Sequence, residues 1–171
     1  NLVQRLYDPS SDPIKQALNM AAGADYQAQV FLKSSVDLMA MREQFALDPA
    51  GFKGAADAYL DGIVEKAPDL FKGDIRAGLA KEAQQVFLGV IDDQHRDIQK
   101  RAANSNGALI DKWSDSLGAA IAGGDPKEIA AARSNLDAAL TVRERLPGLA
   151  WTPEQSAEVH RKAAEDGQRR I

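Results

Sequence analysis

The residues that could perform chemistry are few, and the densest group is Asp92-Asp93-Gln94-His95-Arg96-Asp97. A carboxylate three residues before a histidine shares its helix face, so Asp92 and His95 could supply two metal ligands. A di-metal helical bundle needs a Glu-x-x-His pair on each of two helices and further inward glutamates. The second histidine, His160, has Ala157 three residues before it. We therefore expect no metal site here, and favour a solvated helix face with ion pairs one turn apart.

Sequence signatures of enzymes are missing as well. The chain has no Gly-x-x-x-x-Gly-Lys phosphate loop and no Gly-x-Ser-x-Gly elbow. It has no cysteine, which excludes disulfides, thiolate metal sites and a cysteine nucleophile. None of its many carboxylates is isolated in an apolar run, where burial would raise the pKa of a general acid. We predict that the protein is not an enzyme and binds no cofactor.

Composition indicates an ordinary folded chain. With 171 residues, 44% of them hydrophobic and 27% charged, it is long enough for one domain with its own core. The net charge of −4 gives no strong nucleic-acid signal. No apolar run reaches the roughly 18 residues of a transmembrane helix. Because the sequence begins at Asn1 and not at methionine, we expect a fragment of a longer chain.

The pattern of residues predicts an all-α fold, an elongated helical bundle built around one long helix over residues 69–122. This stretch has no proline, and as a helix it would be about 80 Å long, more than the diameter of a compact domain. Shorter helices are predicted over 12–47, 49–66, 125–146 and 152–171, after a lead-in over 1–11. Asp-Pro at Asp12, Asp48 and Asp125, and Thr152-Pro153, are typical helix starts.

The long helix contains one awkward segment, Asn104-Ser105-Asn106-Gly107, which composition alone would place in a turn. Ile98 and Leu109 are eleven residues apart, which is three helical turns with about 20° of drift. We therefore favour a continuous or kinked helix, with two helices meeting at Gly107 as the alternative. Its apolar side is predicted to comprise Ile75, Leu79, Val86, Phe87, Val90, Ile91, Ile98, Ala102, Leu109, Trp113, Leu117 and Ile121.

The first helix carries more apolar surface than one stripe needs. One face is predicted to contain Ile14, Leu18, Ala21, Ala28, Leu32, Val36 and Met39. A second set, which widens this surface, comprises Val30, Phe31, Leu38, Met41 and Phe45. Such a helix needs more than one neighbour, either inside the bundle or from another subunit.

These surfaces suggest a subunit interface. Polar residues on or near the long apolar stripe can fix register or subunit number, although this middle section could also simply face water. Trp151 precedes a helix cap, where it could act as a staple or as an interface anchor. The possible interface residues are Val30, Phe31, Leu38, Met41, Gln94, Ile98, Arg101, Ser105 and Trp151.

The segment 45–60, FALDPAGFKGAADAYL, resembles helical segments in large structural proteins of tailed bacteriophages, particularly internal virion or ejection proteins. The alanine-, glutamine- and arginine-rich run Ala83–Ala103 is similar in style, and the resemblance covers residues 45–146. It implies a helical module that oligomerises with itself and with other virion proteins, in the virion or in the bacterial cytoplasm during assembly. Some ejection proteins carry a peptidoglycan-cleaving domain whose catalytic glutamate precedes a serine, and no Glu-Ser pair occurs here.

Two functions from different classes therefore stand side by side. The first is a non-enzymatic structural or assembly module of a phage or prophage virion protein, which oligomerises through long helices in the manner of a coiled coil. The alternative is the ligand-binding helical bundle of a bacterial sensory receptor, located in the periplasm or otherwise outside the cytoplasm. No small-molecule ligand is evident from the residues alone.

Overall fold

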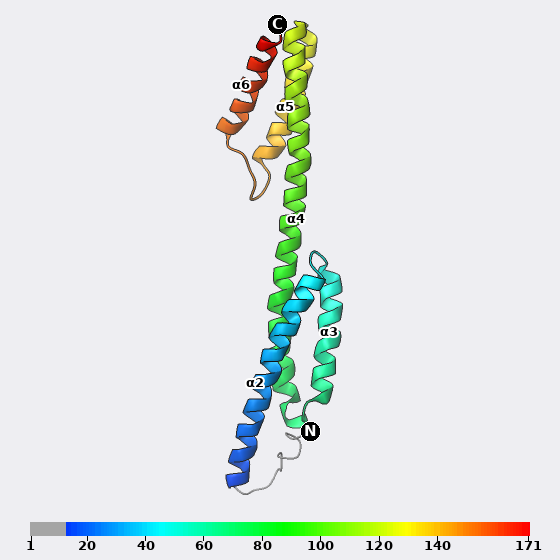
Figure 1. The fold of residues 1–171 in the computed structure, drawn as a ribbon, viewed down its shortest axis with the longest axis vertical. Coiled ribbons are helices and arrows are strands. Elements are labelled where there is room, and N and C mark those ends of the chain that lie inside the picture. The colour runs from blue at the N-terminus through cyan, green and yellow to red at the C-terminus, as the bar shows by residue number, and fades with distance from the viewer. Residues whose placement is uncertain (1–12) are drawn as a thin grey trace. The chain divides into compact units, whose positions relative to one another are not determined.

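The computed structural model describes residues 13–171, and all the regular structure in that range is helical (Figure 1). The elements are α2 (Pro13–Gln44), α3 (Pro49–Lys66), the 3-10 turn η1 (Asp69–Phe71), α4 (Lys72–Gly123), α5 (Pro126–Glu144) and α6 (Pro153–Arg169). The all-α fold and the long helix are confirmed. The predicted lead-in over 1–11 and the capping role of Asp12 lie outside the described residues.

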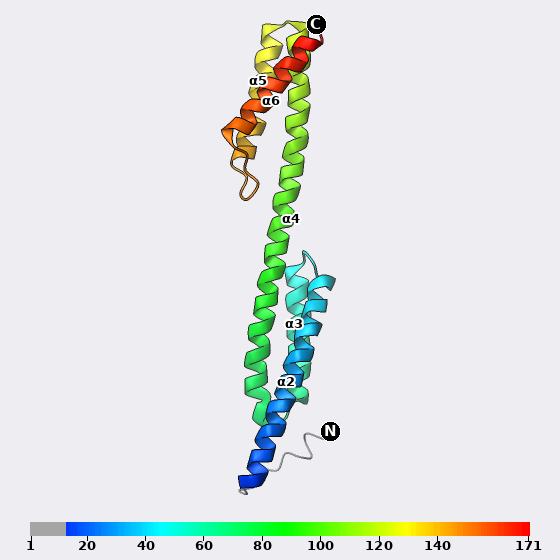
Figure 2. The same ribbon diagram turned by 60° about the vertical axis from the view of Figure 1, so that its left-hand side comes forward.

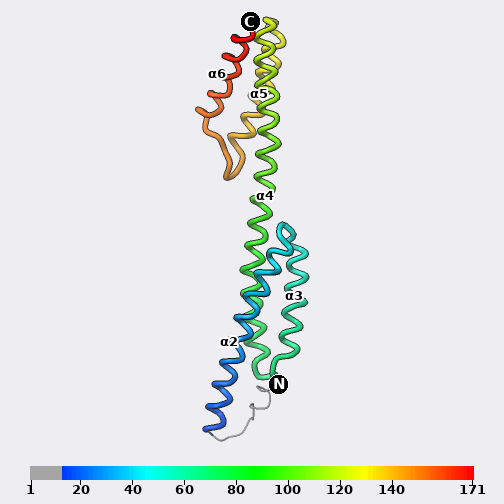
Figure 3. Tube along the Cα trace, in the orientation of Figure 1, coloured from blue at the N-terminus to red at the C-terminus, as the bar shows by residue number. Residues whose placement is uncertain are grey.

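Helix α4 is a single helix of 52 residues that continues through Asn104–Gly107, as the tube in Figure 3 also shows. The side-chain nitrogen of Asn106 donates a hydrogen bond of 2.9 Å to the carbonyl of Ala139 on α5. This tertiary contact occupies a side chain that would otherwise compete for nearby backbone groups and favour a turn. The continuous helix is confirmed, and the alternative of two helices meeting at Gly107 is wrong.

The predicted helix starts are confirmed by their hydrogen bonds. The side chains of Asp48 and Asp125 each accept a backbone N–H from the first turn of their own helix, at 3.0 and 2.8 Å. Thr152 and Gln155 form a reciprocal capping box at the start of α6. A proline follows each of these caps, where no intrahelical N–H is lost. Local sequence therefore determines where these helices begin.

Three helix ends differ from the prediction by two or three residues. Helix α2 ends at Gln44 and not at residue 47, because residues 45–47 form a tight turn before α3. Leu47 adopts a φ of +66° in this turn, a conformation that is uncommon for a side chain of this size. The side-chain nitrogen of Gln94 donates a hydrogen bond of 3.2 Å to the Leu47 carbonyl. Helices α5 and α6 also end two residues early, at Glu144 and Arg169.

The sequence predicts one domain, whereas the packing gathers the chain into two compact units that meet in sequence between Gln94 and His95, within α4. In the first unit, α2, α3 and the first part of α4 run antiparallel to their neighbours in sequence (Figures 1 and 2). Its buried core consists of Leu38, Phe52, Ala56, Leu60, Val64, Ala67, Ile75, Leu79 and Val90.

Helix α2 buries only one of its two predicted apolar faces. Leu38 is fully buried, and Val30, Phe31, Met41 and Phe45 pack against the same core. The larger residues of the other predicted face are exposed, namely Ile14, Leu18, Leu32, Val36 and Met39. At 100° per residue the two sets lie on opposite sides of the helix, and the packing partners α3 and α4 cover only one side.

Two glycines allow aromatic rings to approach helices closely in the first unit. A Cβ added to Gly78 of α4 would lie 2.5 Å from the ring of Phe31 on α2. A Cβ added to Gly23 of α2 would lie 2.3 Å from the ring of Phe71 in η1. Each ring therefore occupies space that is open only because its neighbour has no side chain.

In the second unit, the later part of α4 packs with α5 and α6. Its core consists of Ile110, Leu117, Ala120, Ala132, Leu136, Ala139, Leu140 and Ala163. A Cβ on Gly167 of α6 would lie 2.8 Å from the carbonyl of Gly118 on α4, so small residues bring these helices close together. Arg143 of α5 donates a hydrogen bond of 3.0 Å to the Ala103 carbonyl, and its guanidinium carbon lies 5.0 Å from the ring centre of Trp151.

The predicted apolar side of α4 needs a correction in its second part. Ile98, Ala102 and Leu109 are exposed, and at 100° per residue they lie about 140–180° around the helix from the buried Ile75. The second unit buries Ala103 and Ile110 instead. The reason is that α5 and α6 replace α2 and α3 as partners and cover a different set of positions.

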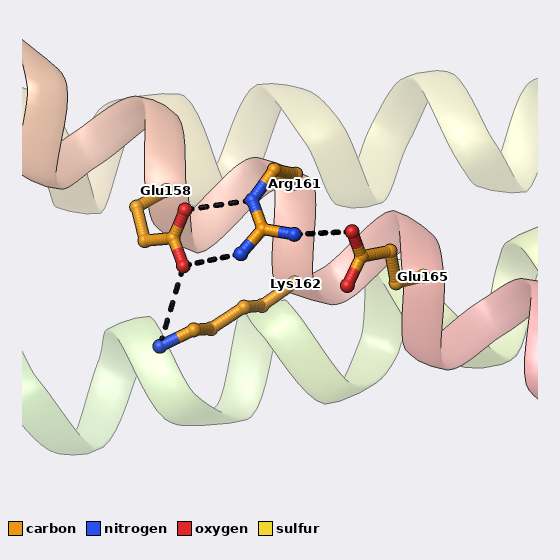
Figure 4. A network of polar contacts seen from close by, with 4 residues as sticks. All are labelled: Glu158, Arg161, Lys162 and Glu165. Atoms are coloured by element: carbon orange, nitrogen blue, oxygen red, sulfur yellow. Dashed lines mark hydrogen bonds and ion pairs between the residues drawn. The ribbon is translucent and has the colours of Figure 1, made fainter.

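Helix α6 presents a charged surface to solvent, as its composition indicates. Arg161 pairs with Glu158 at 2.6 Å and also with Glu165, and Lys162 lies 3.5 Å from Glu158 (Figure 4). The hydrogen bonds from Arg161 lower the pKa of Glu158 to about 2. This carboxylate is therefore ionised throughout the physiological range, and the cluster is a solvated network on one helix face.

Truncation of one leucine on each face of α2 tests which face is buried. We expect Leu38→Ala to lower the free energy of unfolding by about 2–5 kcal/mol, because it leaves a cavity in the core. Leu32→Ala, the matched change on the exposed face, should alter that free energy by no more than about 0.5 kcal/mol. Urea titration measures both, at a protein concentration where the chain is monomeric. A larger loss for Leu32→Ala would contradict the assignment of the two faces.

Adjacent residues of α4 separate a buried polar contact from an exposed one. Asn106→Ala removes the hydrogen bond to Ala139, and we expect a loss of about 1–2 kcal/mol in the free energy of unfolding. Ser105→Ala is the control, since Ser105 is exposed, and we expect a change within about 0.5 kcal/mol. Equal effects of the two substitutions in thermal or urea unfolding would show that the Asn106 contact contributes nothing.

Candidate functional site

The most unusual surface of the first unit is the exposed side of α2. We call it the α2 stripe, and it consists of Ile14, Leu18, Ala21, Ala28, Leu32, Val36 and Met39. At 100° per residue these seven positions fall within about 40° of one line along the helix. Leu18, Leu32 and Val36 are 64%, 71% and 64% exposed. The large side chains of this face therefore lie in water.

The size of the α2 stripe sets it apart from scattered surface leucines. Its five large side chains expose roughly 100 Å² each, so it presents about 500 Å², in the range of the largest apolar patch on a typical monomer. Figures 1 and 2 show the first turns of α2 reaching past the start of α4, where neither α3 nor α4 lies beside them. The stripe is therefore accessible along the length of α2.

One charge interrupts the α2 stripe near its centre. Asp25 lies on the same line of the helix, and its carboxylate accepts a hydrogen bond of 2.8 Å from the side chain of Gln29. The flanking positions include exposed alanines, Ala17, Ala24 and Ala40. Small flanking residues allow another helix to approach to the 8–10 Å typical of packed helix axes. This arrangement suits a helix partner.

A second feature of the first unit is a groove between α2 and α3 with a volume of about 440 Å³. It is lined by Tyr26, Val30, Lys33, Ser34, Ala58, Tyr59, Gly62, Ile63 and Lys66. Apolar walls with a few polar groups are typical of small-molecule sites. The groove could hold an apolar body near two lysines.

The polar side of this groove is organised by Tyr59. Its hydroxyl donates a hydrogen bond of 2.5 Å to Asp37, and it lies 3.4 Å from the hydroxyl of Ser34. Burial, and then the bond to Asp37, raise the pKa of Tyr59. Hydrogen bonds from Lys33 and then from Tyr59 lower the pKa of Asp37. Lys33 is therefore already paired, whereas Lys66 makes no ion pair with any residue in 13–171.

Four of the predicted interface residues belong to the core of the first unit. Leu38 is fully buried, and Val30, Phe31 and Met41 are partly buried against the same core. Their side chains stabilise the packing of α2 on its own unit.

The other five predicted interface residues are spread over α4 and the turn before α6. Gln94 bonds to the turn before α3, Arg101 pairs with Asp97 at 2.7 Å, and Ile98 and Ser105 are exposed. Trp151 is partly buried against the core of the second unit. The polar residue of α4 that the structure buries most is Asn106, one position after the predicted Ser105.

Sequence reasoning therefore recognised both apolar faces of α2 and left open whether its own unit or another subunit covers each of them. A signal was present, because Asp25 lies within the Ile14–Met39 set whereas the opposite set contains two phenylalanines and no carboxylate. A carboxylate is rarely buried without a partner, so it marks the face that the helices of the same unit leave uncovered.

Residues 13–171 contain neither a cluster of metal-ligating side chains nor a helix that could span a membrane. No group of three or more histidine, aspartate or glutamate side chains in residues 13–171 could hold a metal ion. His95 is exposed, and His160 lies 2.7 Å from the carboxylate of Asp137. No helix among those residues is both long enough and apolar enough to cross a bilayer.

No family model, curated protein or solved structure matches this chain. Its function must therefore be inferred from its own surfaces.

Proposed function

We propose that this chain is a non-enzymatic structural module that assembles with further copies of itself through the α2 stripe. The observation that carries the proposal is the exposure of Leu18, Leu32 and Val36 along one continuous helix face. Covering this stripe on two copies would remove about 1,000 Å² of apolar surface from water, the lower end of the range for specific interfaces. Isolated surface leucines would give no such continuous contact area.

The setting we propose is a virion of a phage or prophage, with other virion proteins as further partners. Its support is the resemblance of residues 45–146 to helical segments of internal virion and ejection proteins. The long helix α4 and the exposed apolar stripe on its neighbour α2 suit a protein that works inside an assembly. Other subunits would exclude water from that stripe there.

The groove between α2 and α3 supports a second candidate, a ligand-binding bundle. Tyr26, Val30 and Ile63 provide apolar walls, and Lys66 supplies a positive charge that no described side chain neutralises. The ligand that fits this chemistry is a small amphiphile with an apolar body and one anionic group. This function would be independent of the α2 stripe.

A charge placed on the α2 stripe tests the assembly proposal. We expect sedimentation velocity of the unmodified chain to show self-association that increases with concentration, and Leu32→Glu to abolish it, because burying a carboxylate without a partner is costly. Leu109→Glu is the matched control, since Leu109 is an exposed leucine on α4 in the other unit. It should leave the association unchanged.

Two results would contradict the assembly proposal. One is an unmodified chain that stays monomeric at the highest soluble concentration. The other is equal weakening of the association by Leu32→Glu and Leu109→Glu.

A thermal-shift screen of small amphiphilic carboxylates tests the second candidate. A true ligand should raise the unfolding temperature progressively as its concentration increases, by an amount equivalent to about 2.7 kcal/mol of added stability at one hundred times its Kd. Lys66→Gln should weaken this stabilisation, whereas Lys100→Gln, on an exposed lysine of α4, should not. A screen in which no compound stabilises the protein in this concentration-dependent way, or equal effects of the two substitutions, would remove the groove as a binding site.

A further inference from the structure

We infer that the α2 helices of two copies pair antiparallel, about a two-fold axis that passes beside residues 26 and 27. This inference rests on the proposed self-assembly and specifies its geometry and its partner, a second copy of this chain. It is carried by the order of large and small residues along the α2 stripe.

In an antiparallel pair of α2 helices, the numbers of any two residues that face each other add up to the same value. When residues whose numbers add up to about 53 face each other, Ile14 lies opposite Met39 and Ala21 lies opposite Leu32 of the second copy. Leu18 comes opposite Val36 within one residue, and Asp25 opposite Ala28. In this register Ala21 faces Leu32, so a small and a large side chain share that layer, and the two central layers each pair Asp25 with Ala28.

Parallel pairing gives a poorer match. Each residue would then meet its own copy, so Ala21, Asp25 and Ala28 would form three successive layers of small or charged side chains. Small pairs leave a gap that forfeits dispersion contacts, and two carboxylates at the same level repel each other. In the antiparallel arrangement the two Asp25 are offset by about 4.5 Å along the axis, and each faces an alanine while its carboxylate keeps the hydrogen bond from Gln29 of its own helix. The helix dipoles also oppose each other favourably.

The two-fold arrangement also determines how far assembly through this surface proceeds. An isologous contact uses the same patch on both copies and closes at two. The paired area, about 1,000 Å², is sufficient for a specific but modest interface. Larger assemblies would need a further surface.

The absence of cysteine from the sequence allows a direct test by disulfide cross-linking. Two single-cysteine variants are prepared, Ala21→Cys and Leu32→Cys, one of them with a size tag, and both positions are exposed. We expect mild oxidation of the mixture to give tagged–untagged cross-linked dimers. Ala21→Cys alone should give none, because two copies of residue 21 would be about 16 Å apart along the helix axis. A disulfide needs Cβ atoms about 4 Å apart.

A matched control and sedimentation of the same samples separate the outcomes. Ala77→Cys, at an exposed position of α4, should cross-link with neither stripe variant. Cross-linking of Ala21→Cys to itself would establish parallel pairing and overturn this inference, while self-assembly through the stripe would stand. Self-association with no stripe cross-link would show that another surface is used, and monomers throughout would overturn both the pairing and the proposed function.

Discussion

Both cores of this protein are built on the uninterrupted backbone hydrogen bonding of α4 from Lys72 to Gly123. Between the cores, His95, Arg96, Ile98, Lys100 and Arg101 are exposed, so the helix there is held mainly by its own hydrogen bonds. Helix propagation is far easier than nucleation. Ordered turns in one unit therefore lower the cost of ordering the turns that follow, and the stability of each core is coupled to that of the other through the shared helix.

The positions of the helices were predictable from sequence because they depend on local chemistry. Asp48, Asp125 and Thr152 each cap a helix with a proline beside them, and these contacts involve residues within one turn. The continuity of α4 was predictable from the eleven residues between Ile98 and Leu109. The same spacing failed to predict their burial, because phase reports on the helix itself whereas burial depends on which helices pack beside it.

The candidate site shows the same limit more sharply. The spacing of apolar residues predicts two apolar faces on α2, and neither helix propensity nor hydrophobic periodicity says which of them is buried. The positions of α3 and α4 place Leu38 on the covered face and Leu32 on the open face, and Asp25 is the sequence signal that marks the open one. Ser105 and Asn106 are a similar case, because they are neighbours of comparable polarity that lie 100° apart on the helix. One faces water, and the other reaches the Ala139 carbonyl across the helix interface.

The contacts of Phe31 over Gly78 and of Phe71 over Gly23 have a consequence for the outer surface of the molecule. An aromatic ring can occupy such a position only when α2 has one particular rotation about its own axis, since any other setting would drive the ring into a side chain or backbone. These two ring–glycine contacts therefore fix the rotation of α2 about its own axis. By fixing the rotation of α2 about its axis, they determine which of its two apolar faces is exposed to solvent.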